Sequence, residues 1–293
     1  MTPVEEPIRF GAARELGPRA HEGLAGILHH PASPPARAAV LVVPPFAEEQ
    51  KFSHRVFVNL SRELARRDIA TLRFDLSASG DSFGDSRDAT LRGWKEDIRS
   101  ARAVLETRFP RAPLVLVGLR LGATLALEAA GDPPPLAALV LWEPVQSGEK
   151  YIDEILRRRM IKEMMTTGRK ATGREAVLRE LEASGVIDLD GVALGRTLIE
   201  EISALDAQTL AARFPGRVLL VQISYNAKVS PALESLAKKL AETGADVRTV
   251  GIRLETIWDR VELVDATELI RTTADWIAAA LPPSPPAGGR GHG

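Results

Sequence analysis

The regular alternation of largely apolar segments with amphipathic segments constrains the fold of this chain most strongly. The apolar segments have the length of β-strands and are rich in aliphatic and β-branched residues. Such strands are typical of a parallel sheet that is covered by helices on both faces. We expect strands at 38–45, 69–76, 113–118, 138–144, 217–223 and 245–252. We expect the covering helices at 57–67, 94–109, 122–130, 231–243 and 262–281.

The alternation stops between residues 146 and 213. Helical segments follow one another there, at 151–165, 174–183, 195–202 and 207–212, and no strand is predicted. We therefore predict a helical cap at 146–213, inserted between two parts of one core at 1–145 and 214–281. Residues 8–28 could add two edge strands. The Pro- and Gly-rich residues 282–293 predict a disordered tail.

Composition excludes several classes of function. The 293 residues include 38 basic and 39 acidic ones, so bulk charge indicates neither nucleic acid nor an anionic membrane surface as a partner. There is no cysteine, which excludes thiolate catalysis, disulfides and cysteine-bound metals. No apolar run approaches the roughly 20 residues of a membrane span, and the N-terminus does not resemble a secretory signal. We therefore expect a cytoplasmic protein with no membrane span. The sequence has no phosphate loop, dinucleotide fingerprint or metal cluster, so we expect no cofactor and no metal.

The most informative segment is LVLVGLRLGATLALEAA, residues 114–130. A buried strand leads through Gly118, Arg120, Leu121 and Gly122 into a helix, which is the frame of the nucleophile elbow G-x-S-x-G. The sharp turn requires glycine on both sides of its central residue. Here the central residue is Arg120, whose guanidinium has five donors and no lone pair with which to attack an acyl carbon. By itself, the motif could also be an ordinary strand-to-helix turn of a doubly wound fold.

Neighbouring segments favour the hydrolase frame over the ordinary turn. RFDLSASGDSFGD, residues 73–85, resembles the R-x-D-x-x-G-x-G-x-S signature of α/β-hydrolases, with Ala78 in place of the first glycine. The segment after strand 38–45 is where that fold places its oxyanion loop. The loop residues predicted here are Phe46, Ala47, Glu48 and Glu49.

The other two members of a Ser-His-Asp triad are also replaced. Asn226 follows strand 217–223, where the acid is expected, and asparagine cannot stabilise an imidazolium by charge. The stretch 253–265, where the histidine is expected, contains none, and Glu255 and Trp258 lie closest to that position. We interpret His54 as a surface residue at the start of a helix. The sequence therefore predicts no catalytic residue of the usual serine mechanism.

Four segments together resemble a known family. They are VVPPFAEEQKF (42–52), DLSASGDSFGDSRDAT (75–90), GLRLGA (118–123) and LWEPVQSGEKYIDEILRRR (141–159). They are similar to the exosortase A system-associated hydrolase 2 family, which resembles serine aminopeptidase-like α/β-hydrolases and has the same G-L-R-L-G-A elbow. The resemblance covers about residues 8–280. It implies an α/β-hydrolase fold with a cap and a link to exopolysaccharide and protein-sorting loci, with a protein of that system as a partner.

Three functions remain open for the altered site. A helix N-terminus favours an anion and disfavours a cation by roughly 0.3–1 kcal/mol, so Arg120 needs an acidic partner. In the first hypothesis Arg120 binds a small anionic ligand under the cap, with Glu143, Asn226 and Trp258 as further pocket residues. In the second, Arg120 is a structural clamp paired with Glu48, Glu49 or Glu143. In the third, the chain is an active hydrolase that uses Glu48 or Glu49 with a bound water.

Overall fold

The central sheet has eight strands, and its middle strands are parallel. The computed structural model describes residues 3–11, 23–32, 36–167, 174–189, 191–211, 214–260 and 262–281. The sheet contains β1 (Val4–Phe10), β2 (Leu24–His30), β3 (Ala38–Val43), β4 (Ile69–Phe74), β5 (Leu114–Leu119), β6 (Ala138–Trp142), β9 (Arg217–Ser224) and β10 (Asp246–Arg253). Their order is β1-β2-β4-β3-β5-β6-β9-β10. Strand β2 pairs antiparallel with both β1 and β4, whereas the strands from β4 to β10 pair in parallel. The predicted mostly parallel sheet is confirmed. The N-terminal segment adds two strands, as expected, but only β1 lies at the edge, because β2 pairs with both β1 and β4.

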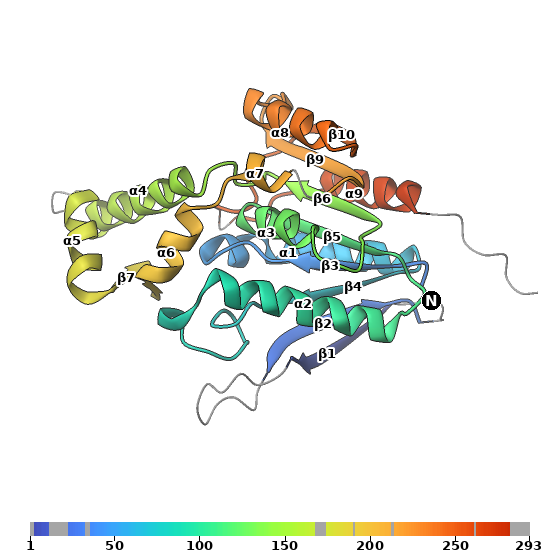
Figure 1. Ribbon diagram of the computed structural model, residues 1–293, viewed down its shortest axis with the longest axis horizontal. Coiled ribbons are helices and arrows are strands. Elements are labelled where there is room, and N and C mark those ends of the chain that lie inside the picture. Colours follow the sequence, from blue (N-terminus) through green and yellow to red (C-terminus); the bar gives the residue numbers. More distant parts are fainter. Residues whose placement is uncertain are drawn as a thin grey trace, which may run out of the picture.

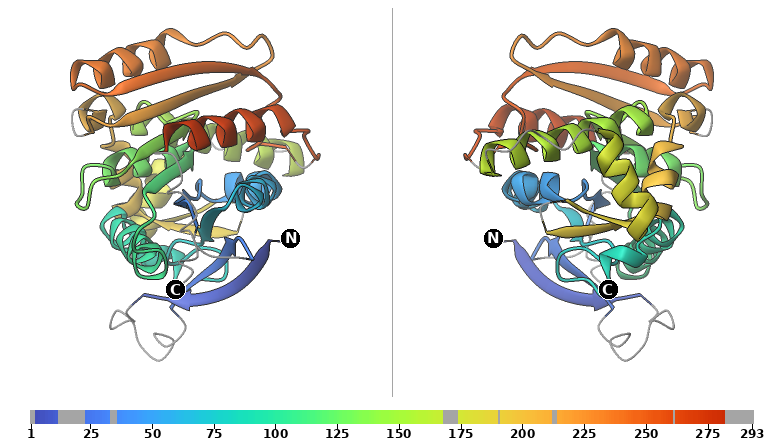
Figure 2. Two further views of the ribbon diagram at one scale, coloured as in Figure 1. Left: turned by 90° about the vertical axis from the view of Figure 1, so that its right-hand side faces the viewer. Right: turned by 90° about the vertical axis from the view of Figure 1, so that its left-hand side faces the viewer.

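Helices cover both faces of the sheet, as predicted (Figures 1 and 2). One face carries α1 (Glu48–Arg66) and α9 (Thr267–Ala280). The other carries α2 (Leu91–Arg108), α3 (Leu121–Ala129) and α8 (Pro231–Glu242). A short 3-10 helix, η2 (Ser86–Asp88), precedes α2.

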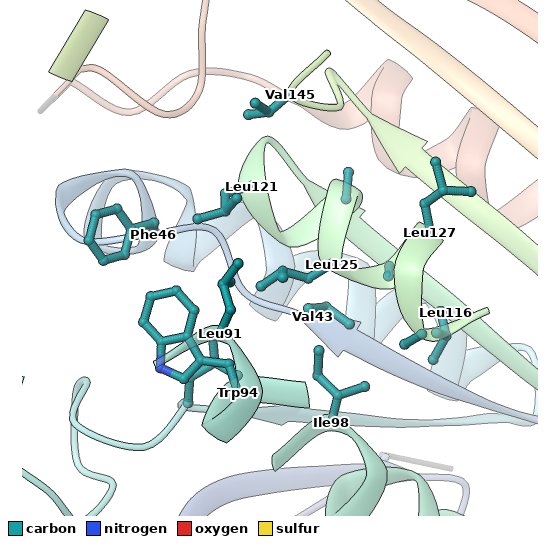
Figure 3. Close-up of a cluster of buried hydrophobic side chains, with 14 of the residues drawn as sticks. Val43, Phe46, Leu91, Trp94, Ile98, Leu116, Leu121, Leu125, Leu127 and Val145 are labelled. Atoms are coloured by element: carbon teal, nitrogen blue, oxygen red, sulfur yellow. The ribbon is translucent and has the colours of Figure 1, made fainter. Parts of the chain in front are cut away.

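The alternation of side chains along the strands divides the core into two apolar layers. In β5, Leu116 packs in the layer that contains α2 and α3, whereas Val115 and Val117 pack in the layer that contains α1 and α9. Figure 3 shows part of the first layer, where Leu125 of α3 and Ile98 of α2 lie beside the sheet. Strands that are buried on both sides have no polar face, which is why the sequence showed them as continuous apolar runs.

Helix α1 begins nine residues earlier than predicted, at Glu48 instead of residue 57. Its first turns are Glu48–His54, which are mostly polar, so they lack the apolar periodicity on which the prediction depended. Two of these polar residues, Glu49 and Ser53, are nevertheless buried. The early start brings Glu49 into the first turn of the helix, next to the end of the sheet.

The inserted segment between β6 and β9 lies beyond the C-terminal ends of the central strands, at the left of Figure 1. It contains α4 (Gly148–Thr167), α5 (Arg174–Ser184), α6 (Arg196–Ser203) and α7 (Ala207–Ala211). It also contains an antiparallel hairpin, β7 (Val186–Leu189) and β8 (Val192–Gly195), which the sequence analysis did not predict. The sequence signal for that hairpin was the Asp-Gly pair between two alternating apolar stretches.

The remaining sequence expectations concern the tail and the membrane. The tail predicted at 282–293 lies outside the described residues. Among the described residues, no helix combines the length and apolar character that crossing a bilayer requires. The described part of the chain also holds no group of three or more histidine or acidic side chains placed to bind a metal ion.

Candidate functional site

Arg120 lies at the turn between β5 and α3, in a backbone conformation that L-residues rarely adopt. Its φ is 54° and its ψ is −122°. The turn is held by hydrogen bonds, because the Arg120 N–H donates to the carbonyl oxygen of Trp142 at 2.9 Å and its own carbonyl accepts from Ala123 at 3.1 Å. Such a conformation costs on the order of 1–3 kcal/mol and persists only where the surroundings enforce it. Arg120 therefore lies in a sharp, strained strand-to-helix turn of the kind that the G-x-R-x-G pattern predicts.

The two glycines of the elbow are required by close backbone packing. A Cβ atom on Gly118 would lie 2.6 Å from the Cα of Ala123. A Cβ atom on Gly122 would lie 2.4 Å from the carbonyl oxygens of Val43 and Pro44. Both distances are shorter than real Cβ contacts, so any side chain would push the helix away from the strand. This is the steric reason predicted from the G-x-R-x-G pattern.

The loop after β3 has a second strained residue. Ala47, the N-cap of α1, has φ 53° and ψ −126°, almost the same values as Arg120. Its neighbour Phe46 is buried, with its ring centroid 5.5 Å from that of Trp94. Leu121, the first residue of α3, is buried as well, in the same apolar cluster as Phe46 and Trp94, and Figure 3 shows these three side chains. The loop after β3 and the start of α3 thus pack against the same apolar cluster.

The guanidinium of Arg120 is bound by two carboxylates from different elements. Its Nε lies 3.3 Å from Oε1 of Glu49 in α1, and its Nη2 lies 2.8 Å from Oε2 of Glu154 in α4. The rings of Tyr151 and Trp258 flank it, with centroids 5.3 and 5.2 Å from Cζ. The Arg120 side chain is only 14% exposed. Arg120 is therefore paired and covered, and it does not line the cavity described below.

Glu49 is the most deeply buried charged partner of Arg120. Its side chain is 5% exposed, and its Oε2 accepts a hydrogen bond of 3.0 Å from the hydroxyl of Tyr151. Arg158 adds a second guanidinium at 3.7 Å. Burial raises the pKa of Glu49, and the two arginines and the tyrosine hydroxyl oppose that rise. Burial tends to lower the pKa of Arg120, but Glu49 and Glu154 outweigh it and raise that pKa above its usual value.

Glu154 occupies the exposed side of the same cluster. Its side chain is 44% exposed and bonds to both Arg120 and Arg158. Partial burial tends to raise the pKa of Glu154, but the two guanidiniums lower it. The cluster therefore alternates acidic and basic groups from the buried Glu49 outward to Glu154. Because Glu154, Tyr151 and Arg158 all belong to α4, the cluster joins the inserted segment to the sheet.

The other acidic residues predicted near Arg120 have different partners. Glu48 pairs with Lys162 of α4 at 3.3 Å, in an exposed ion pair. Glu143 follows β6 with a φ of 47° and accepts hydrogen bonds from the N–H of Ile223 and, at 2.6 Å, from the side chain of Gln222. Burial raises the pKa of Glu143. Of the three predicted acidic partners, the structure therefore pairs Arg120 with Glu49 alone.

Asn226 and Trp258, the remaining predicted pocket residues, lie in different environments. Trp258 is buried and lies against Arg120. Asn226 is exposed, and its Oδ1 accepts from the N–H of Lys228 at 3.0 Å and from the hydroxyl of Ser224 at 3.1 Å. This is the local hydrogen bonding of an asparagine in a turn.

Sequence analysis did not identify Glu154, Tyr151 or Arg158 as site residues. All three lie on α4, and 151, 154 and 158 have the i, i+3, i+7 spacing that brings side chains to one helix face. That spacing was visible in the sequence. What it could not show is that this face turns toward the elbow.

Comparison with known proteins gives the fold. No family model and no curated protein matches the sequence. Among solved structures, Est1E from Butyrivibrio proteoclasticus with bound ferulic acid has a TM-score of 0.63 and 18% identity, covering 88% of this chain and 96% of that chain. A thermostable carboxyl esterase from Bacillus coagulans has a TM-score of 0.61 and 13% identity, with coverage of 94% and 99%. The α/β hydrolase GrgF from Penicillium sp. has a TM-score of 0.57 and 15% identity, with coverage of 95% and 99%. Together with the strand order and the helices on both faces, these similarities show that the chain has the α/β-hydrolase fold.

Proposed function

We propose that this chain is a non-catalytic α/β-hydrolase-fold protein in which Arg120 clamps the inserted segment, acting as a cap, onto the sheet. The observation that carries the proposal is the double pairing of Arg120 with Glu49 and Glu154 at the position of the nucleophile. A guanidinium offers no nucleophile. The buried carboxylate beside it also makes this spot unfavourable for the oxyanion of an acyl-transfer reaction, because like charges repel.

A chain without a nucleophile at this turn would act by binding a ligand or a partner protein, as an accessory protein. The sequence resemblance to exosortase A system-associated hydrolase 2 supports an accessory function beside exopolysaccharide or protein-sorting machinery, with a protein of that system as partner. The geometry of the cluster supports this role in one respect. A cap held by ion pairs presents a defined outer surface, including the exposed residues of α4, without admitting a substrate to the elbow.

Labelling with a fluorophosphonate probe tests the proposal. We expect no covalent labelling of the purified chain and no turnover of p-nitrophenyl esters above background. The variant Arg120→Ser should also remain unlabelled, since the stretch 253–265 after β10, where the histidine base is expected, contains no histidine. Stoichiometric labelling of any serine in the wild-type chain would refute the proposal.

A second candidate is an anion-binding role for Arg120. It is favoured by the exposure of Glu154, which is 44%, and by the second guanidinium of Arg158 that could hold Glu154 when an anion takes its place. Such a ligand would stabilise the folded chain by about 2.7 kcal/mol at 100 times its dissociation constant. A screen of anions by thermal shift, with Arg120→Lys as the charge-retaining control, distinguishes this role from the clamp.

The third hypothesis, a hydrolase that uses Glu48 or Glu49, has less support. Oε1 of Glu49 accepts from Arg120 and Oε2 accepts from the hydroxyl of Tyr151, so both oxygens already have protein partners. Glu48 is held by Lys162 at the surface. Hydrolysis of an ester or amide that is lost in Glu48→Gln or Glu49→Gln would restore this hypothesis.

A further inference from the structure

A cavity of about 320 Å³ lies between helix α1 and the β1, β2 and β4 edge of the sheet. Its walls combine apolar side chains, such as those of Ile27 and Phe57, with a few polar ones. The polar groups come from Gln50 and His54 of α1, from Arg73 and Asp75 at the end of β4, and from Arg9 of β1 and Asp81. Mainly apolar walls with a small number of convergent polar groups are typical of a small-molecule site, although this volume is near the lower end of the usual range of about 300–1,000 Å³.

Arg73 is the distinctive residue of this cavity, because it is a largely buried cation without an ion pair. Among the described residues, its guanidinium has no carboxylate oxygen within 4.0 Å, and its one hydrogen bond runs from Nε to Nε2 of His29 at 3.2 Å. Burial lowers the pKa of Arg73. A guanidinium carries five N–H donors in a planar fork, so most of them have no described partner. Arg120, by comparison, is satisfied by two carboxylates.

The carboxylates near Arg73 already accept hydrogen bonds from other groups. The two oxygens of Asp75 accept from the side chain of Gln50 at 2.5 Å and from the N–H of Asp81 at 3.0 Å. The two oxygens of Glu5 are held by Arg62, at 2.6 and 3.3 Å. These contacts fix the carboxylates in place. The charges of Glu5 and Asp75 oppose the lowering of the Arg73 pKa, but neither carboxylate forms a direct ion pair with its guanidinium.

His29 and His54 complete the polar side of the cavity. Because Nε2 of His29 accepts from Arg73, the proton of that neutral ring is assigned to Nδ1, which lies 3.8 Å from Glu5. His29 thus holds the guanidinium in orientation without neutralising it. His54, on α1, is exposed and makes no described hydrogen bond, so its ring is free to donate to a ligand.

We propose that this cavity binds a small carboxylate with an apolar body, held by the guanidinium of Arg73 and assisted by His54. The fork of Arg73 matches the two oxygens of a carboxylate, and a buried cation without a counter-ion gains most from such a partner. The apolar walls would take the body of the molecule, and the volume suits a ligand of the size of benzoate or hexanoate. This site is separate from Arg120 and does not depend on the proposed clamp.

Isothermal titration calorimetry with benzoate and hexanoate tests the proposal. We expect saturable binding of both carboxylates to the full chain, and no binding of the neutral analogues benzamide and hexanol. Arg73→Gln should weaken carboxylate binding by about tenfold or more, which corresponds to about 1.4 kcal/mol. Arg73→Lys should lose less, because lysine keeps the charge but not the fork. The matched control is Arg99→Gln, which removes an exposed arginine outside the cavity.

A second variant keeps the test decisive if Arg73→Gln does not fold. Ile27 lies opposite Arg73 in the register of β2 and β4 and lines the cavity, so Ile27→Trp should fill the space and abolish binding while Arg73 stays in place. Absence of saturable benzoate and hexanoate binding to the wild type would overturn the proposal. So would binding that Ile27→Trp leaves unchanged. Binding of inorganic phosphate in place of both carboxylates would overturn the assigned ligand class.

Discussion

The side chains of Arg120 and Glu154 form an ion pair of 2.8 Å between the elbow and the inserted segment. Arg120 belongs to the turn that follows β5, and Glu154 lies in the second turn of α4. Glu49 continues the pair on the buried side. The centre of the turn between β5 and α3 is thus part of a contact between two parts of this chain.

Arg120→Ala should destabilise the folded chain by about 3 kcal/mol, because it leaves Glu49 buried without its nearest cation. Alanine retains the Cβ atom, so the strained backbone contributes equally to both proteins. The control is Arg99→Ala, which removes an exposed pair with Asp132 and should cost less than about 1 kcal/mol. Urea unfolding at neutral pH measures both values. Equal losses in the two variants would contradict the clamp.

Glu49→Gln and Glu154→Gln should differ in their effects although both remove one charge from Arg120. Glu49 is 5% exposed, so its charge is poorly replaced by water, and we expect a loss of about 2 kcal/mol. Glu154 is 44% exposed and screened by solvent, so its loss should stay below about 1 kcal/mol. Unfolding free energies of the two variants decide the order. A larger cost for Glu154→Gln would mean that the cap contact, and not the buried pair, dominates.

Gly122→Ala should be severely destabilising, with an expected cost of about 3 kcal/mol or failure to fold. The new Cβ atom would meet two backbone carbonyl oxygens, which cannot rotate away as a side chain would. Gly244→Ala is the comparison, since Gly244 has open space around it and a φ of +90°, so only the backbone conformation is penalised, by about 1–2 kcal/mol. Thermal unfolding of both variants gives the comparison, and a soluble, fully stable Gly122→Ala protein would refute the steric argument.

The free energy of unfolding should fall on acidification over the pH range in which His29 titrates differently in the folded and the unfolded chain. Burial, aided by the charge of Arg73, lowers the pKa of His29 from 6.5 to about 4. Between these two values the unfolded chain binds a proton that the folded chain does not, so unfolding becomes easier as the pH falls from about 6.5 to about 4. The full effect is about 3 kcal/mol. Above pH 6.5 this contribution is fully present.

The variant His29→Gln isolates this contribution, because glutamine keeps an acceptor for Arg73 and does not titrate. Urea midpoints measured across the window should fall more steeply for the wild type than for the variant. Parallel curves would show that other groups, such as His54 or Glu5, produce the acid dependence.

Much of the fold could be predicted from the sequence. The buried strands show as apolar runs because each is covered on both sides, and the covering helices show as 3.6-residue periodicity. The elbow was predictable for a similar reason, because the need for glycine at 118 and 122 arises from backbone contacts within one strand, turn and helix. The β7–β8 hairpin was missed, although its Asp-Gly pair was present in the sequence.

The site required the tertiary structure. The sequence by itself placed Arg120 at the centre of a G-x-R-x-G turn, where the nucleophile-elbow pattern has serine, and predicted that this cation needs an acidic partner. Only the packing of α4 over the sheet decided that Glu154 and Tyr151 join Glu49 there, and that Glu48 and Glu143 pair elsewhere. The same holds for Arg73 and His29, which are adjacent only because β2 pairs with β4. Local periodicity reports which face of an element is buried, whereas an ion pair depends on how two elements cross, and that is set by the whole core.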